Sequence, residues 1–496
     1  MKSAEKVIRP VIFIALAAAL LSLLYSMMMR PEVSRGQEWG SDRFVNFYRM
    51  DKDTVDVLFF GSSMGVNAFD PQELYDLYGI RSYNLSSVQQ SLAVSYYWLE
   101  EALKYQTPKV VMCDSRFLFP QHADHVLNAD DGSVHDAFDY IRFSPSRLRA
   151  VREIGELDPS LDLTQFYLPH IRYHERWKDI NEDTLDRKHV EEMNLLGYSP
   201  GTDRLDHYDS YDRGASPDSV CDPVHEVSAG YLDRMISLCN EKGIRFVLVS
   251  LAGNNMNDAY DRLLTEYAAE RGADYINFCE TQVVNAIGAR YPEETISTHS
   301  NLRGAMRFSV YLGALLQNEY GIPSVRDEQY EATDVYYQKI VQNDGLRNEK
   351  DPAAFLAAAD RPRYAVFISS KWLTEEDVPV PVRELLSGMG FDTDPEKIMA
   401  AGGYAAVKSE EGVTELFDPW PKLSGTIRGG SIRYSVRGAR SDPDSVSSIC
   451  IADTEYSPDR KGLNIAVYDM EVRTFVTSVN ICGDDKGRII LTGNEW

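Results

Sequence analysis

Short apolar runs alternate with amphipathic stretches along residues 54–325. Runs typical of buried strands occur at 57–60, 81–85, 109–113, 244–250 and 275–278. Between them, apolar residues recur every three or four positions, as Leu92, Tyr96, Leu99 and Leu103 do, which is typical of a helix packed by one face. Strands that alternate with helices predict an α/β domain with a parallel sheet covered on both faces.

The alternation pauses between residues 115 and 223, a stretch rich in His, Tyr, Arg, Trp and Asp. We interpret it as a largely helical insertion after the third strand. Insertions at strand ends often form the wall of a cleft. His174, Arg176 and Trp177 are therefore candidates for contacting a sugar, and the alternative is that they pack and pair within the insertion.

The first 30 residues contain an uncharged apolar run, residues 11–29, which is long enough to cross a bilayer as a helix. Lys2, Lys6 and Arg9 precede it and predict a cytoplasmic N-terminus. A cleaved signal peptide is the alternative, although the run ends without a small-residue cleavage site. We expect a single-pass cell-membrane anchor, a polar linker over 31–53, and an extracytoplasmic location for the rest.

Beyond residue 325 the pattern changes. Residues 326–360 are polar and helical in character and predict a connector. From 361 to 496, short strands separated by Gly, Asp, Ser and Pro clusters predict a smaller β-rich α+β module, similar to a β-sandwich.

Charge, cysteine content and the absence of certain motifs limit the classes of partner and cofactor that we expect. The 496 residues include 51 Lys and Arg against 76 Asp and Glu, a net charge of −25, which disfavours nucleic acid as a partner. Six cysteines do not make a disulfide framework, although Cys450 and Cys482 could pair. We find no His/Cys cluster at metal-ligand spacing and no glycine-rich phosphate cradle, so we expect no metal and no cofactor.

The first strand leads directly into Gly61-Ser62-Ser63. A serine at the carboxyl end of a strand lies where open α/β sheets carry their sites, and backbone amides after the turn, those of Ser63 and Met64, can face an oxyanion. A serine nucleophile needs a base, and His299 is the candidate, in a loop just before a helix.

This order of parts resembles the SGNH (GDSL-type) hydrolase superfamily over residues 54–320. The closest likeness is to membrane-anchored members that add or remove acyl groups on bacterial cell-surface polymers and often carry Gly-Ser-Ser in place of Gly-Asp-Ser. Their late Asp-x-x-His-Leu-Asn motif, followed by a glycine, is similar to the stretch from His299 to Gly304. The resemblance implies a flavodoxin-like sheet, Ser63 as nucleophile, His299 as base and Asn84 as an oxyanion contributor.

Two residues depart from that motif: Ile296 at the acid position, and Ser300 in place of the leucine that follows the histidine. Ile296 stands where the family has its orienting aspartate, so we expect Glu294, or a backbone carbonyl between residues 294 and 297, to hold the far ring nitrogen of His299. Asn254 or Asn255 falls where the third block would supply an oxyanion donor, and spacing does not decide between them.

Two passages of the C-terminal module resemble the interleukin-like EMT-inducer domain family. They are residues 363–369 with 385–390, and residues 461–469, in an order that implies a circular permutation. The resemblance implies sugar binding without naming residues, and the alternative is a purely structural domain.

Together these features predict O-acetyl transfer to, or removal from, an extracytoplasmic or cell-surface polysaccharide, without a cofactor. A membrane-bound acyl-donor protein is a possible partner. The alternative is a catalytically inactive SGNH-like protein that binds polysaccharide or assists its assembly.

Overall fold

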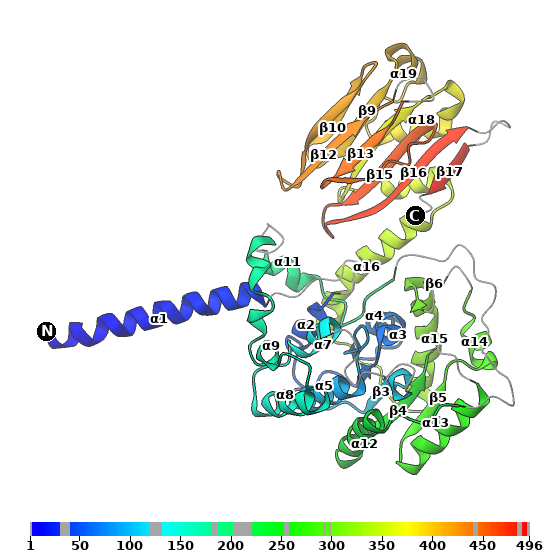
Figure 1. The fold of residues 1–496 in the computed structure, drawn as a ribbon. Coiled ribbons are helices and arrows are strands. Elements are labelled where there is room, and N and C mark those ends of the chain that lie inside the picture. The colour runs from blue at the N-terminus through cyan, green and yellow to red at the C-terminus, as the bar shows by residue number, and fades with distance from the viewer. Residues whose placement is uncertain are drawn as a thin grey trace. The chain divides into compact units, whose positions relative to one another are not determined.

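The computed structural model (Figure 1) describes residues 2–29, 40–119, 131–179, 186–201, 221–251, 257–290, 294–296, 299–439, 445–483 and 489–493. The chain divides into two compact units, Met1–Tyr337 and Gln338–Trp496. The first carries a parallel sheet between helices, and the second is antiparallel and β-rich. The α/β class expected for the first soluble part and the β-rich character of the C-terminal part are confirmed.

Five parallel strands form the sheet of the first unit, in the order β2-β1-β3-β4-β5. Their bounds are β1 Val57–Phe60, β2 Ser82–Asn84, β3 Val110–Asp114, β4 Arg245–Ser250 and β5 Asp274–Asn277. The chain passes from β1 to β2 on one side and then returns to β3 on the other. Open α/β sheets hold their ligands beyond the carboxyl ends of the strands at such a reversal, here between β1 and β3.

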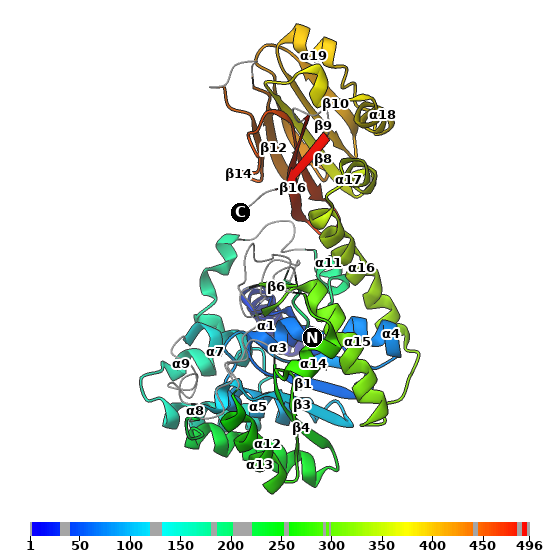
Figure 2. The same ribbon diagram turned by 90° about the vertical axis from the view of Figure 1, so that its right-hand side faces the viewer.

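Alternate side chains of β1 enter two different cores. Leu58 and Phe60 face one core, and Val57 and Phe59 face the other. Figure 2 shows β1, β3 and β4 between the two helix layers that close these cores. One layer holds α5 Leu92–Ala102, α12 Glu226–Glu241 and α13 Asp258–Glu270; the other holds α4 Pro71–Tyr78, α14 Thr281–Ile287 and α15 Leu302–Asn318. Because both faces of these strands are buried, nearly every position in their sequences is apolar.

The connection from β1 to α4 contains an element that the sequence pattern does not predict, the short helix α3 Ser63–Ala68. Six residues are too few to show a helical period. Asp70 caps α4 by accepting from Glu73 N, and Gly79 ends the helix with φ +66°. The consequence of α3 is that Ser63 is the first residue of a helix.

The N-cap of α4 predicts a pH dependence of stability. Burial raises the pKa of Asp70 to about 7 and that of Glu73 to about 7. The Tyr337 hydroxyl, 2.7 Å from Asp70 Oδ2 and 3.3 Å from Glu73 Oε2, donates to both carboxylates and lowers both pKa values, but by less than burial raises them. Because these values exceed those of unfolded carboxyls, the folded state holds its protons more tightly, and stability falls as the pH rises from about 4 to 7. We expect a lower melting temperature at pH 8 than at pH 5. Asp70→Asn, which keeps a capping oxygen, should flatten that slope, and an unchanged slope would assign it elsewhere.

All the regular secondary structure in the described residues of the insertion after β3 is helical. Its elements are η1 Arg116–Leu118, α7 Asp131–Phe138, α8 Pro145–Leu157, α9 Leu163–Tyr167, η2 Pro169–Ile171, η3 His174–Asp179 and α11 Arg187–Glu192. The buried guanidinium of Arg147 donates to the carbonyls of Phe138, Asp139, Ile141 and Phe166 and so joins α7, α8 and α9.

At the N-terminus, α1 Lys2–Met28 contains an 18-residue stretch, Val11–Met28, that is long and apolar enough to cross a membrane. None of that stretch is buried against the rest of the protein. The short helix α2 Asp42–Phe47 follows and packs into the core of the first unit.

Two antiparallel sheets build the second unit. The six-stranded sheet has the order β10-β9-β8-β15-β16-β17, and the four-stranded sheet has the order β11-β12-β13-β14. The strands are β8 Tyr364–Lys371, β9 Tyr404–Ser409, β10 Gly412–Phe417, β11 Lys422–Ile427, β12 Ile432–Arg437, β13 Ser448–Ile451, β14 Thr454–Glu455, β15 Gly462–Asp469, β16 Thr474–Gly483 and β17 Ile489–Gly493. One apolar core lies between the two sheets, as in a β-sandwich.

A second core of this unit joins the other face of the six-stranded sheet to a helical layer (Figure 2). The helical layer contains α17 Pro352–Ala359, η4 Glu375–Asp377, α18 Val380–Gly388 and α19 Pro395–Ala401. The stretch expected as a connector therefore has two parts. Helix α16 Glu328–Asn348 passes from the first unit to the second, whereas α17 belongs to the core of the second. All six cysteines lie in the described residues as thiols, so the disulfide considered between Cys450 and Cys482 is not formed.

Candidate active site

Ser63 lies at the point where β1 turns into α3. Gly61 makes that turn with φ +156°, and a Cβ atom on it would lie 2.6 Å from Asp114 Cβ on the neighbouring strand. Only glycine permits such a close approach of the two chains. Ser62 caps α3 by accepting from Met64 N at 3.3 Å. The sheet and the turn together place Ser63 at the strand-order reversal, beyond the carboxyl end of β1.

The structure brings Ser63 and His299 together, although 236 positions separate them: Ser63 Oγ lies 2.8 Å from His299 Nε2. His299 belongs to a hairpin of β6 Thr295–Ile296 and β7 His299–Ser300, in which Ile296 pairs with His299. Directly after the hairpin, Asn301 caps α15 by accepting from Gly304 N. The cap and the hairpin fix the backbone on both sides of the imidazole.

The environment of His299 favours its neutral form. Partial burial, and then the positive charge of Arg116, lower the pKa of His299 below its ordinary value of 6.5. A neutral imidazole that carries its proton on Nδ1 accepts a hydrogen bond at Nε2, and the Ser63 hydroxyl is the donor in reach. Near neutral pH this geometry is that of a serine paired with a general base.

Arg116 provides a test of that electrostatic arrangement. Its guanidinium lies 3.2 Å from Met64 Sδ, beside the serine turn. Arg116→Gln removes the nearby positive charge, so the pKa of His299 should rise and the acid limb of kcat/KM for an acyl ester should move to higher pH. The exposed Arg290→Gln is the control and should leave the limb in place. An unmoved limb in Arg116→Gln would contradict the assignment of the limb to His299.

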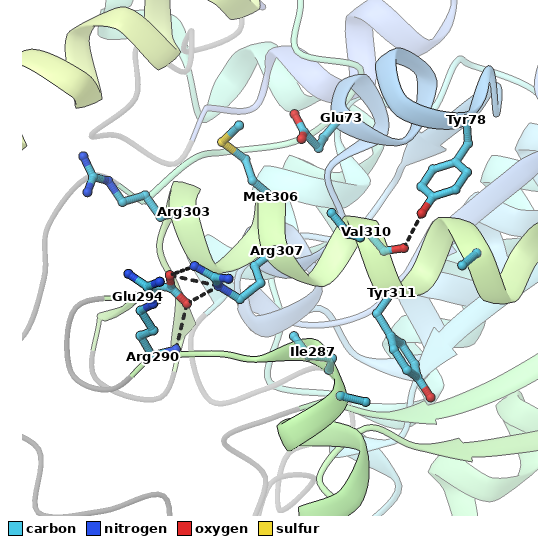
Figure 3. Close-up of a pocket in the computed structure, with 12 residues that line it drawn as sticks. Glu73, Tyr78, Ile287, Arg290, Glu294, Arg303, Met306, Arg307, Val310 and Tyr311 are labelled. Carbon is cyan, nitrogen blue, oxygen red and sulfur yellow. Dashed lines mark hydrogen bonds and ion pairs between the residues drawn. The ribbon is translucent and has the colours of Figure 1, made fainter.

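The expectation that the Glu294 side chain orients His299 is wrong. The Glu294 carboxylate is buried and binds the guanidinium of Arg307, with Oε1 2.6 Å from Nη2 and Oε2 2.8 Å from Nε, and it accepts from Arg290 N at 2.7 Å (Figure 3). A buried carboxylate next to a guanidinium is best satisfied by this forked pairing. The alternative is that a backbone carbonyl between residues 294 and 297 holds the far ring nitrogen of His299. It involves residue 297, which lies outside the described residues.

Asn84 also has a different role from the one expected. Its Nδ2 donates to the carbonyls of Gly65 and Phe69, each at 2.9 Å, and its Oδ1 accepts from Ser86 N. Both amide hydrogens are thereby used inside the fold, so Asn84 holds α3 in place and does not donate to an oxyanion. Ser63 N and Met64 N lie in the first turn of α3, where helix amides have no intrahelical acceptor. Met64 N donates to the capping Ser62 Oγ, so the amide of Ser63 is the better candidate for an oxyanion. Asn254 and Asn255 lie outside the described residues.

The three candidate sugar contacts lie in the insertion. The Arg176 guanidinium stacks 4.0 Å above the Tyr173 ring and lies 3.5 Å from the carbonyl of Met28 in α1. His174 Nδ1 lies 2.6 Å from the carbonyl of Ile171, within its own turn, and Trp177 is exposed. The contacts of Arg176 and His174 are with the insertion and the end of α1, as in the packing alternative, whereas Trp177 is not packed within the insertion.

Sequence reasoning missed two residues beside the serine, Asp114 and Arg116. Asp114 Oδ2 accepts from Ser62 Oγ at 2.7 Å and Asp114 Oδ1 from Arg116 N at 3.1 Å, which ties the end of β3 to the serine turn. The sequence contains a signal for Asp114, which ends the apolar run of β3. Because the carboxyl ends of adjacent parallel strands meet at one edge of the sheet, this position predicts that Asp114 lies beside the end of β1.

Among the described residues, no group of three or more His, Cys, Asp or Glu side chains is placed to hold a metal ion. A depression of about 640 Å³ over the outer face of α15 is lined by Arg290, Arg303 and Arg307 but includes neither Ser63 nor His299 (Figure 3). No protein-family model and no curated protein matches the chain.

Proposed function

We propose that the chain is a membrane-anchored enzyme that transfers O-acetyl groups to, or removes them from, an extracytoplasmic or cell-surface polysaccharide. The observation that carries the proposal is the 2.8 Å contact between Ser63 Oγ and His299 Nε2 at the strand-order reversal. The class of substrate is supported by the resemblance of the Gly61-Ser62-Ser63 and His299 motifs to those of membrane-anchored SGNH enzymes.

The geometry allows the following reaction. His299 Nε2 takes the proton of Ser63 as Oγ bonds to the carbonyl carbon of an acyl ester, and the carbonyl electrons move onto its oxygen. When the tetrahedral intermediate collapses, the ester C–O bond breaks and the imidazolium returns the proton to the leaving alkoxide. A sugar hydroxyl or water then loses its proton to His299 as its oxygen bonds to the acyl carbon. When this second tetrahedral intermediate collapses, the bond between the acyl carbon and Oγ breaks, and the imidazolium returns the proton to Ser63 Oγ. Amides of the first turn of α3, that of Ser63 above all, are the donors closest to the developing oxyanion.

Transfer and hydrolysis differ only in which hydroxyl reaches the acyl-serine. In the transfer reaction, a membrane-bound acyl-donor protein is the partner that would acylate Ser63, because an extracytoplasmic enzyme has to receive its acyl group across or from the membrane. The chemistry within this chain is the same in both cases.

A fluorophosphonate probe tests the proposal, because it phosphonylates serines that a base has activated. We expect labelling of the full-length wild-type protein and none of Ser63→Ala. The alternative, a catalytically inactive glycan-binding or assembly protein, is favoured by Ile296 at the acid position and by the pairing of Glu294 with Arg307. Folded wild-type protein that resists the probe but binds polysaccharide would support that alternative.

The proposed topology is a cytoplasmic N-terminus with both units outside. The uncharged run of α1 behind Lys2, Lys6 and Arg9 motivates it. The expressed protein should remain in the membrane fraction after a carbonate wash and retain Met1 or Lys2 at its N-terminus. A soluble product that begins near Arg35 would identify the run as a cleaved signal peptide.

A further inference from the structure

We propose that residues 163–178 of the insertion form a second membrane contact, which lies in the headgroup region of the bilayer next to the exit of α1. This interfacial segment comprises α9, η2 and most of η3. The inference rests on the proposed membrane-spanning role of α1. It adds a surface of the folded first unit that binds lipid directly.

The last turns of α1 contact the interfacial segment. The ring of Tyr25 lies 5.7 Å from the ring of His170, edge to face, and Arg176 Nη1 lies 3.5 Å from the carbonyl of Met28. Helix α1 also contacts η3 along the backbone. Figure 1 shows that the rest of α1 extends away from the first unit, with only its C-terminal end against the insertion. The segment that surrounds this end is therefore fixed relative to the bilayer.

The length of α1 sets the depth of that contact. At about 1.5 Å per residue, the 18-residue stretch Val11–Met28 spans roughly 27 Å, slightly less than the roughly 30 Å of a hydrocarbon core. Tyr25 and Met28 thus lie at the outer boundary of the hydrocarbon. Side chains that touch Tyr25 and Met28 must lie at the level of the lipid headgroups.

The interfacial segment exposes large apolar side chains at this level. Trp177 is 58% exposed, Leu168 46%, Ile171 40% and Tyr167 37%. Four such side chains within eleven residues are unusual on a water-facing surface, whereas Trp, Tyr and Leu are typical where protein meets the headgroup region. Burial in lipid explains why these residues are not packed inside the insertion.

The charge of the interfacial segment agrees with a lipid partner. In a chain of net charge −25, residues 163–178 contain Arg172, Arg176 and Lys178 against a single acidic residue, Glu175. Long basic side chains beside exposed aromatic rings are typical of surfaces that bind anionic headgroups. The partner that fits the segment is the outer surface of the same bilayer that α1 crosses, and two attachments would limit the tilt of the first unit over that surface.

Quenching by brominated lipids tests the proposal on the full chain in nanodiscs. Bromine near the top of the acyl chains quenches tryptophans at the interface. We expect Trp177→Phe to lose a clear part of the quenching that wild type shows with shallow bromines. Trp420→Phe is the matched control, because Trp420 is 57% exposed but belongs to the second unit, and it should be quenched like wild type. Trp39, which follows α1, contributes the same background in all three proteins.

Three outcomes would overturn the inference. Equal quenching in wild type and Trp177→Phe would show that Trp177 faces water. A loss in Trp420→Phe without one in Trp177→Phe would assign the second contact to the other unit. Failure of all three proteins to insert into nanodiscs would overturn the anchor itself and the inference with it, whereas insertion without Trp177 quenching would leave the anchor and the Ser63 chemistry untouched.

Discussion

Ser63→Ala and His299→Ala are each expected to lower the turnover of an acyl ester such as p-nitrophenyl acetate by about 10⁴-fold or more. Either substitution removes one member of the Ser63–His299 pair, whose Oγ and Nε2 atoms lie 2.8 Å apart. A serine without its base is a poor nucleophile, and a base without its serine has nothing to activate. Because the two act as a unit, the double variant should be hardly slower than either single variant.

The control for Ser63→Ala is Ser115→Ala. Ser115 is also a serine at the carboxyl edge of the sheet, buried where Ser63 is half-buried, and its Oγ lies 2.9 Å from Ser250 Oγ instead of a histidine. Its loss should leave turnover close to that of wild type. Turnover that persists in Ser63→Ala would assign the nucleophile to another residue, and multiplicative losses in the double variant would mean that Ser63 and His299 act independently.

The parts of the fold that sequence predicts are those whose local pattern and tertiary environment agree. The strands β1, β3 and β4 are buried on both faces, so their apolar runs define them to within a residue or two. By contrast, the pattern does not predict β10 Gly412–Phe417 and β11 Lys422–Ile427, because both are largely half-exposed and contain polar residues or glycine. Pairing with β9 and β12 defines them, and a single stretch of sequence does not contain that information.

The same distinction applies to the site. Ser63 and His299 are predicted because each follows a recognisable local signal, a strand that ends in glycine and a polar loop before a capped helix. The roles predicted for Asn84 and Glu294 are wrong, because the partner of a polar side chain depends on the tertiary fold and not on the local sequence. Asn84 meets two backbone carbonyls of the serine helix region, and Glu294 meets a guanidinium 13 positions away.

Gly61→Ala is expected to lower turnover by about two orders of magnitude or more, because a misplacement of about 1 Å at a reacting group can cost that much. A Cβ atom at Gly61 would lie 2.6 Å from Asp114 Cβ, far inside van der Waals contact. Neither chain can yield easily, since β1 and β3 are paired through Phe60 and Cys113 in the middle of the sheet. The turn that carries Ser63 must therefore move away from His299.

Gly243→Ala separates this effect from the general cost of alanine at positive φ. Gly243 has φ +69° and follows α12 at the opposite edge of the sheet, and a Cβ atom on it would meet no atom of the described residues within 4 Å. Both variants should lose stability, the first by about 1–3 kcal/mol from overpacking and the second by about 1 kcal/mol from backbone strain. Only Gly61→Ala should also lose turnover and fluorophosphonate labelling under conditions where both proteins are folded. Full activity in Gly61→Ala would mean that the serine turn tolerates displacement from β3, and that the Ser63–His299 distance does not depend on the close approach of the two strands.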